Sequence, residues 1–221
     1  MSLLSAWSRA RPAADTAFVA AARGWMQGAE SEMLDRVWKG YDALLAERPP
    51  FDGSDLERSV TEHLEIGIQG SMSGYEPFVV QHGPHERETK LPAPAQPPQY
   101  DIAFVFLADR RLMWPLEAKV LITPGALADY IADVNEQFLT CRYAPFSASG
   151  AMVGYLLTGE ETTALTNIGA RLGGPLAPSK THTDRPTGVS AHTRTVPEGK
   201  PYPVQFECHH LILKFEGVSR V

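Results

Sequence analysis

Two acidic residues and a lysine in the middle of the chain have the types and spacing of a hydrolytic metal site. Glu117 and Lys119 lie two residues apart within the apolar segment Leu112 to Ile122, and Asp101 stands near the start of the preceding apolar segment. If Leu112 to Ile122 is a strand, its side chains alternate, so Glu117 and Lys119 share one face. A carboxylate and an ammonium are costly to bury unless they pair or bind an ion. The pattern therefore predicts a functional site.

A hairpin is predicted to bring the three residues together. Tyr100 to Leu107 and Leu112 to Ile122 are rich in strand-forming residues, and a short turn separates them. Pairing of the two strands would place Asp101 close enough to Glu117 for both carboxylates to face one point. Two carboxylates beside a lysine suit Mg²⁺ and a phosphate. The alternatives are an ion pair between Glu117 and Lys119 at a solvated edge, and an Asp101 that only caps the turn at the strand entry.

The order of these features resembles the PD-(D/E)xK nuclease superfamily. Asp101, then Glu117-Ala118-Lys119 on the next strand, then a helix and a further strand carry the likeness, which covers roughly Asp55 to Thr158. One departure is that Tyr100, and not proline, precedes Asp101. The resemblance implies an α/β, restriction-endonuclease-like fold, in which a central mixed sheet is flanked by helices and completed by the strand Val204 to Phe215.

The resemblance also implies roles for individual residues. Asp101 and Glu117 would hold Mg²⁺, or Mn²⁺ in its place, and Lys119 would orient the attacking water and offset charge that develops on the phosphate. A third carboxylate would come from the helix before the sheet. Glu57 is the first choice because it shares a flank with other inward-facing positions of that helix, and Glu62 and Glu65 are the alternatives. The helix after the Glu-x-Lys motif would supply Gln137 near the scissile phosphate, with substrate contacts from Tyr130, Arg142 and Tyr143.

The function that follows is a Mg²⁺-dependent nuclease that hydrolyses phosphodiester bonds. DNA is favoured over RNA as its substrate, and a role in restriction or anti-phage defence is what the family implies. Cutting both strands of a duplex usually requires two active sites, so we expect a homodimer or a partner subunit. The alternative is a catalytically degenerate protein of the same fold that serves as a binding or scaffold subunit of a larger complex.

Two further groups of residues invite a functional interpretation. The segment Gly173 to Pro203 is locally basic, and we expect its His192 and Arg194 to contact the nucleic acid, although a solvated loop is the equal alternative. The run Cys208-His209-His210 contains zinc-ligand types. Only Cys208 and His210 would share a face of a strand, and no second ligand pair follows at finger spacing, so zinc is not expected there.

Helices and further strands must surround this hairpin. We interpret residues 1–50 as an N-terminal helical extension and 51–221 as the nuclease-like domain. The predicted helices are Ala29 to Glu47, a helix that opens at Ser54 or Asp55 and runs to Ile68, Ala126 to Tyr143, and Glu161 to Leu172. The further strands are Pro77 to His82, Ala151 to Thr158 and Val204 to Phe215, with loops over Gly83 to Gln99 and Gly173 to Pro203.

Composition limits the classes of protein that the chain can represent. Its 221 residues suffice for one domain with an extension. Acidic residues number 26 and basic residues 20, a net charge of −6, so any contact with nucleic acid must be local. The longest apolar runs fall well short of the roughly 20 residues that a membrane helix needs, and no membrane partner is expected. Two cysteines are too few for a disulfide framework, and we expect a cytoplasmic protein.

Overall fold

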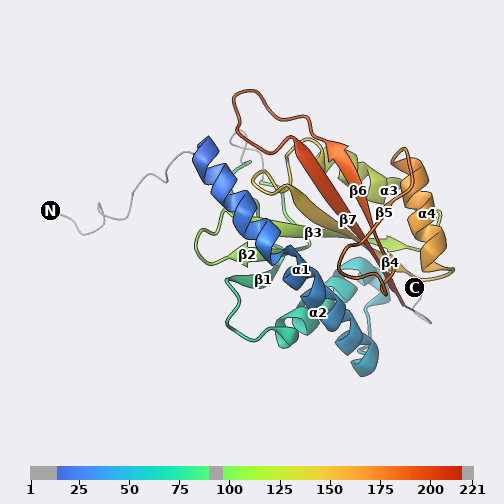
Figure 1. Cartoon of the computed structure of the whole chain (residues 1–221). Helices are drawn as coiled ribbons and strands as arrows, with labels where there is room; N and C mark the ends of the chain where they lie inside the picture. Colours follow the sequence, from blue (N-terminus) through green and yellow to red (C-terminus); the bar gives the residue numbers. More distant parts are fainter. Residues whose placement is uncertain (1–13, 90–96, 216–221) are drawn as a thin grey trace.

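The computed structural model describes residues 14–89 and 97–215, which build an α/β structure around one seven-stranded mixed sheet (Figure 1). Its strands are β1 (Phe78–His82), β2 (Ile102–Phe106), β3 (Met113–Leu121), β4 (Ser149–Leu156), β5 (Ala177–Pro178), β6 (Thr187–Thr193) and β7 (Gln205–Lys214). They lie in the order β1-β2-β3-β4-β7-β6-β5. The central pairs β3–β4 and β4–β7 are parallel, and the outer pairs are antiparallel. The prediction of a mixed α/β sheet flanked by helices is confirmed.

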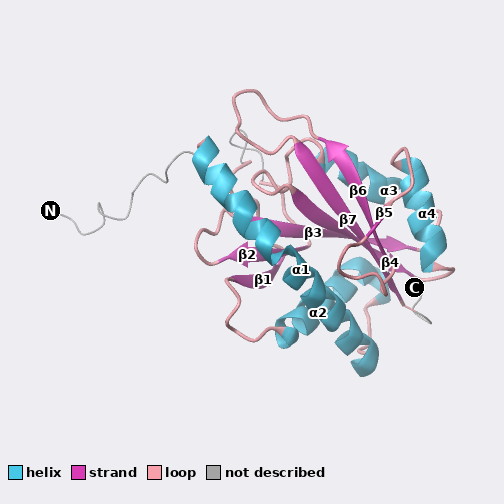
Figure 2. Ribbon diagram, in the orientation of Figure 1, coloured by secondary structure: helices cyan, strands magenta, loops and turns pink. Residues whose placement is uncertain are grey.

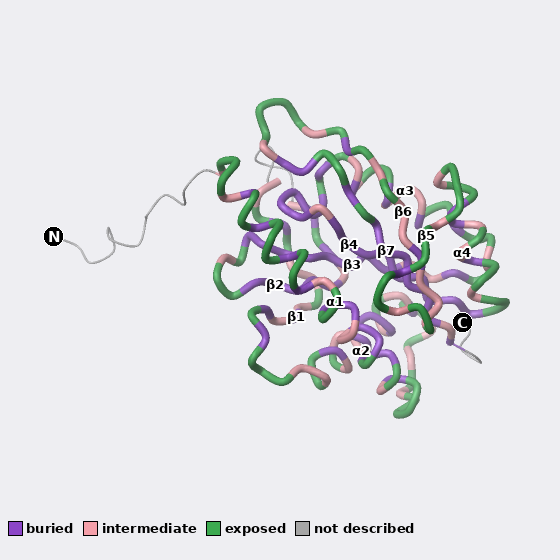
Figure 3. Tube along the Cα trace, viewed as in Figure 1, coloured by how far each residue is buried: buried purple, intermediate pink, exposed green. Residues whose placement is uncertain are grey.

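Helices cover both faces of the sheet (Figure 2). On one face, α1 (Thr16–Glu47) and α2 (Leu56–Ser71) share an apolar core with inward-facing strand residues such as Leu116 and Ala118. On the other face, α3 (Ala128–Asp133) and α4 (Glu161–Arg171) enclose a second apolar cluster. Figure 3 shows the resulting contrast between buried central strands and exposed outer surfaces of the helices. Among the described residues, no helix is long and apolar enough to cross a membrane.

Helix α1 is longer than the sequence pattern predicted. It begins at Thr16 instead of Ala29, and Asp15 caps it by accepting a hydrogen bond from the Phe18 backbone N–H at 2.7 Å. The additional turns bury three side chains against the sheet, those of Val19, Ala22 and Met26. The stripe of buried residues therefore runs along the whole helix, and α1 shares its core with the sheet.

Helix α2 positions Glu57 and packs closely against α1. Asp55 occupies the N-cap position of α2, one of the two positions predicted, but its side chain forms no capping hydrogen bond. A short 3₁₀ turn precedes α2, and there Asp52 accepts hydrogen bonds from the Ser54 backbone and side chain. The two helices cross where Gly40 meets Ile68. A Cβ atom on Gly40 would lie only 2.7 Å from atoms of Ile68, so glycine is required for this approach.

The predicted hairpin is present, and its register fixes the centre of the sheet. Strand β2 pairs antiparallel with β3, with Ile102 opposite Leu116. Strand β3 then pairs in parallel with β4, which places Glu117 opposite Met152. Parallel neighbours need a crossover connection, usually a helix, and α3 lies in the connection between these two strands.

The helix after β3 is shorter than predicted. Helix α3 ends at Asp133, and a π-helical segment, η3 (Val134–Phe138), continues the same direction for one turn. The chain then leaves the helix, with Cys141 and Ala144 in the left-handed region at φ of 61° and 50°. The prediction of one helix from Ala126 to Tyr143 did not anticipate this change because the apolar spacing continues through the turn.

The segment Gly173 to Pro203, predicted as a loop, contains β5 and β6. Strand β6 pairs with β7 along its whole length, from Thr187 opposite Leu211 to Thr193 opposite Gln205. Its sequence, TGVSAHT, lacks a marked apolar alternation. The strand forms because the edge of β7 is available for pairing. This depends on the tertiary structure and cannot be read from the sequence pattern of residues 187–193 alone.

Candidate functional site

Asp101 and Glu117 lie side by side where β2 and β3 begin to pair. Asp101 immediately precedes β2, and its Oδ2 accepts a hydrogen bond from the Ala118 backbone N–H at 2.7 Å. The two carboxyl groups lie close enough for the charge of Asp101 to raise the pKa of Glu117. The hairpin therefore brings the two carboxyl groups together.

Glu117 is buried in this arrangement and is not fully satisfied. Its exposed fraction is 6%, and its Oε2 atom has no hydrogen-bond partner within the described part of the chain. Burial, followed by the charge of Asp101, raises the pKa of Glu117 well above its usual range despite the nearby ammonium of Lys119. Burial also raises the pKa of Asp101. Two buried carboxyls of this kind are expected to gain from a positive ion between them.

The ammonium of Lys119 lies at the centre of the carboxylates. Its Nζ is 3.0 Å from Glu117 Oε1, 3.1 Å from Asp133 Oδ2 and 3.5 Å from Glu57 Oε1. Burial opposes the charged form of Lys119, but the surrounding carboxylates, Glu117 first, outweigh it and raise the pKa. Lys119 is therefore a fixed cation in this site. The pair is not at a solvated edge, because β3 is flanked by β2 and β4.

Glu57 reaches the site from α2, on the other side of β3. Its Oε2 accepts a hydrogen bond from the Val120 backbone N–H at 3.0 Å, and its Oε1 faces Lys119. Burial raises the pKa of Glu57, against the lowering effect of Lys119. The alternatives from the same helix lie elsewhere: Glu62 is paired with Arg58 at 2.9 Å, and Glu65 lines a neighbouring groove.

The helical connection after β3 supplies two further polar side chains. Asp133, at the end of α3, holds Lys119. Gln137 lies one turn later in η3, and its buried Oε1 atom has no hydrogen-bond partner among the residues that the structure describes. Asp133 was not predicted from the sequence. The spacing could have indicated it: Asp133 lies four residues before Gln137, so the two share one face of the predicted helix, and Gln137 was predicted to face the site.

The residues predicted to contact substrate are divided between surface and core. Tyr143 is buried, its hydroxyl donates to the Gln99 carbonyl at 2.7 Å, and burial together with Glu117 and Asp101 raises its pKa, so it borders the site. Arg142 is exposed beside it. Tyr130 belongs to α3 and is buried against the sheet, where its hydroxyl contacts His210 and the Met152 carbonyl, so it is not available to a substrate.

Arg194 holds the loop after η3 from within the core. Its exposed fraction is 4%, and its guanidinium donates four hydrogen bonds to backbone carbonyls at 2.6–3.0 Å, namely those of Phe138, Tyr143, Ala144 and Ser147. The guanidinium also lies over the Phe206 ring, 4.6 Å from its centroid. This arrangement positions Tyr143 and does not present the charge of Arg194 to a ligand.

The other basic residues of the segment 173–203 are largely paired within the chain. Arg185 forms two hydrogen bonds with Asp42 at 2.6 and 2.8 Å, and Lys200 lies 3.5 Å from Glu88. His192 is half-buried and bonded to Ser190 at 2.6 Å. Lys180 is exposed. The positive charge that the sequence places in this segment therefore mostly stabilises the fold.

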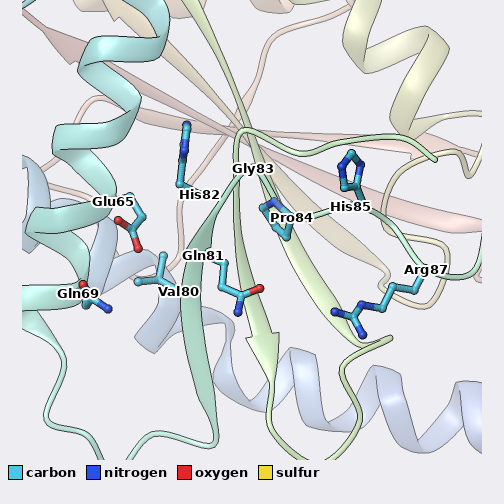
Figure 4. Close-up of a pocket in the computed structure, with 9 residues that line it drawn as sticks. All are labelled: Glu65, Gln69, Val80, Gln81, His82, Gly83, Pro84, His85 and Arg87. Atoms are coloured by element: carbon cyan, nitrogen blue, oxygen red, sulfur yellow. The ribbon is translucent and has the colours of Figure 1, made fainter. Parts of the chain in front are cut away.

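A groove of about 980 Å³ runs along the free edge of the sheet beside α2 (Figure 4). Strand β1 and the chain that follows form one wall, and Glu65 and Gln69 of α2 contribute to the other. The basic side chains along it are His82, His85 and Arg87. Gly83, in the same wall, donates its N–H to the Asp101 backbone carbonyl at 2.9 Å, although no residue of the carboxylate cluster itself lines the groove.

These contacts define a cluster of four carboxyl groups around one ammonium, formed by Asp101, Glu117, Glu57, Asp133 and Lys119. Such a cluster can hold a divalent cation, orient a water molecule and offset negative charge on a bound oxyanion. Comparisons with protein-family models, curated proteins and solved structures give no match to this chain.

Proposed function

We propose that this protein is a metal-dependent nuclease of the restriction-endonuclease-like fold that hydrolyses phosphodiester bonds in DNA. The observation that carries the proposal is the position of Lys119, whose Nζ lies within 3.5 Å of Glu117, Glu57 and Asp133 and beside Asp101. An ion pair that served stability alone would need only one carboxylate. Four carboxyl groups around one half-buried ammonium leave net negative charge, which a divalent cation would neutralise.

The donor set fits Mg²⁺. This ion is usually bound through one or two carboxylates, with water and substrate phosphate completing its octahedron. Asp101 and Glu117 form such a pair, and the unpartnered Oε2 of Glu117 is a free ligand atom. Glu57 would join through a water or after a small movement, because its oxygens face Val120 and Lys119. When bound, Mg²⁺ or Mn²⁺ supplies Lewis-acid activation of the phosphate and lowers the pKa of a coordinated water.

The chain's own residues then have distinct tasks. Lys119 orients the attacking water and offsets charge as the phosphorus–oxygen bond to the leaving group breaks. Asp133 and Glu57 hold the ammonium of Lys119 in place. Gln137, with its free buried oxygen, can accept a hydrogen bond from that water. Tyr143 borders the same space and forms part of its wall.

Substrate would reach this cluster along the groove beside β1. Its basic side chains, His82, His85 and Arg87, can contact a phosphate backbone. The net charge of −6 predicts weak binding by a single chain, so a second copy or a partner subunit would supply further contacts. Two copies would also provide two sites for cutting both strands. Both cysteines are buried and free, which suits a reducing cytoplasm. A role in restriction or anti-phage defence would follow from the family resemblance alone.

The test is a cleavage assay on the purified full chain after metal removal. Supercoiled plasmid, linear duplex, single-stranded DNA and RNA are each incubated with Mg²⁺, Mn²⁺ or EDTA. Cleavage of DNA with either metal and none with EDTA is the expected result. Binding of DNA without cleavage in any metal would instead indicate a scaffold subunit whose site is degenerate, and would contradict the proposed enzyme.

A further inference from the structure

A second group of ligand-type side chains lies on the opposite face of the sheet from Lys119, under helix α1. Glu30 comes from α1, and Glu207 and His209 come from β7. One ligand atom from each of the three residues lies within 4.8 Å of the other two. The register separates this group from the nuclease site, because His209 pairs with Ala151 in the α1-side core whereas Glu117 pairs with Met152 on the α3 side.

His209 provides an independent indication of a ligand. Its exposed fraction is 5%, yet within the described ranges neither ring nitrogen has a hydrogen-bond partner. The Nε2 atom lies 3.2 Å from Glu30 Oε1, an ion pair when the ring is protonated, but the contact lacks the geometry of a hydrogen bond, and the Nδ1 atom has no hydrogen-bond partner in the part of the chain that is described. Buried imidazole nitrogens are normally paired, so this ring is poised to bind something between itself and Glu30. Its neighbour His210 differs, because both of its nitrogens contact hydroxyls, those of Tyr130 and Ser190.

Hydrogen bonds from neighbouring side chains hold the carboxylate of Glu30 in place. The hydroxyl of Ser149 donates to Glu30 Oε2, and the indole Nε1 of Trp114 donates to Ser149 Oγ at 3.0 Å. Such outer contacts orient metal ligands and leave their other oxygen free to coordinate. Glu207 is exposed, two residues from His209 on the same face of β7, and can rotate to close the site.

We propose that Glu30, Glu207 and His209 bind a divalent transition-metal ion, with Zn²⁺ as the expected ion. One imidazole and two carboxylates form a donor set of mixed nitrogen and oxygen that favours zinc over Mg²⁺ or Ca²⁺, which prefer oxygen alone. Three protein ligands leave a fourth tetrahedral position for water, on the side where Glu207 meets solvent. The ion would also tie α1 to the centre of the sheet.

Metal binding to the full chain tests this proposal. Protein stripped with chelator and dialysed is titrated with Zn²⁺ by calorimetry, and Co²⁺ is added separately to record visible absorption from a bound ion. We expect one Zn²⁺ per chain at the site, a Zn²⁺-dependent rise in melting temperature and a Co²⁺ spectrum typical of low coordination number. Absence of Zn²⁺ binding to the folded wild-type chain would overturn the proposal.

Variants assign the binding to these residues. Glu207→Gln changes an exposed side chain, so it should fold normally and weaken Zn²⁺ binding at least tenfold, and His209→Gln should weaken it further. Glu198→Gln, another exposed glutamate, is the matched control and should bind as wild type does. Asp101→Asn should also retain Zn²⁺ binding, which separates this site from the nuclease cluster. Unchanged affinity in Glu207→Gln, or equal loss in Asp101→Asn, would contradict the assignment.

Discussion

Lys119 on β3 and Asp133 at the end of α3 are joined by an ion pair of 3.1 Å between Nζ and Oδ2. This contact links the strand that carries the Glu-x-Lys motif to the helix that follows it. It also completes the set of carboxylates around the ammonium. In the proposed nuclease, Asp133 is a positioning residue that acts through Lys119.

Replacement of Asp133 by Asn is expected to slow DNA cleavage by roughly tenfold or more. A hydrogen bond to a charged group contributes about 1.5–3 kcal/mol, and tenfold in rate corresponds to about 1.4 kcal/mol. The effect should fall on kcat, because substrate binding does not depend on Asp133. Asp129→Asn, one turn earlier on the exposed surface of α3, should leave cleavage unchanged. Equal rates for Asp133→Asn and wild type would refute the positioning role.

Replacement of Arg194 by Gln is expected to destabilise the fold by at least about 3 kcal/mol. Four backbone carbonyls lose their donor, and buried acceptors left without partners are costly. Urea unfolding followed by circular dichroism measures the change. Arg142→Gln is the control, since an exposed arginine should alter stability by less than about 0.5 kcal/mol. A loss in Arg194→Gln no larger than in the control would contradict its structural role.

Replacement of Gly40 by Ala is expected to destabilise the contact between α1 and α2 by about 1–3 kcal/mol, because the new methyl group would overlap Ile68. The same substitution at Gly28 in α1 meets no atom within 4 Å and should raise stability by up to about 1 kcal/mol, through helix propensity. Thermal unfolding of the two variants therefore should shift in opposite directions. If the melting temperatures of both variants shifted in the same direction, the close contact between α1 and α2 at Gly40 would be contradicted.

Glu76 ties the loop after α2 to α1, and its contribution should depend on pH. Its carboxylate accepts hydrogen bonds from the backbone N–H groups of Ser73 and Gly74 and lies 3.0 Å from Arg36. The Ser73 hydrogen bond is the largest cause that lowers the pKa of Glu76, to about 2 from an ordinary 4.5. A lowered carboxyl pKa stabilises the folded state above the unfolded pKa and ceases to do so as pH falls through the folded pKa.

Glu76→Gln should therefore lower the urea midpoint at neutral pH, and its difference from wild type should shrink as the pH falls from 4.5 toward 2. Glu47→Gln, at an exposed position, serves as the control and should show little difference at either end. A deficit in Glu76→Gln that is the same at both ends of this range would argue against an ionised, hydrogen-bonded carboxylate.

The sequence predicted the parts of the site that depend on strand alternation. Asp101, Glu117 and Lys119 could be placed together because a hairpin with period-two side chains allows few arrangements. Glu57 could be predicted as the third carboxylate because it lies beside the buried positions of its helix. Arg194 could not be anticipated, because a basic residue in a polar segment looks the same whether it faces solvent or four carbonyls. The contact of Glu30 with His209 joins residues far apart in sequence, and no local pattern encodes it.

The most direct test of the proposed nuclease activity is the rate of plasmid cleavage by Lys119→Ala beside wild type, in Mg²⁺ and in EDTA. Circular dichroism of both proteins confirms that each is folded. A metal-dependent nuclease should cleave in Mg²⁺ and lose this cleavage in EDTA. The rate should fall at least about 100-fold in Lys119→Ala, since the electrostatic contribution of one such group is typically about 2.7–4 kcal/mol. Cleavage that persists in EDTA, or is unchanged in Lys119→Ala, would contradict the proposed function.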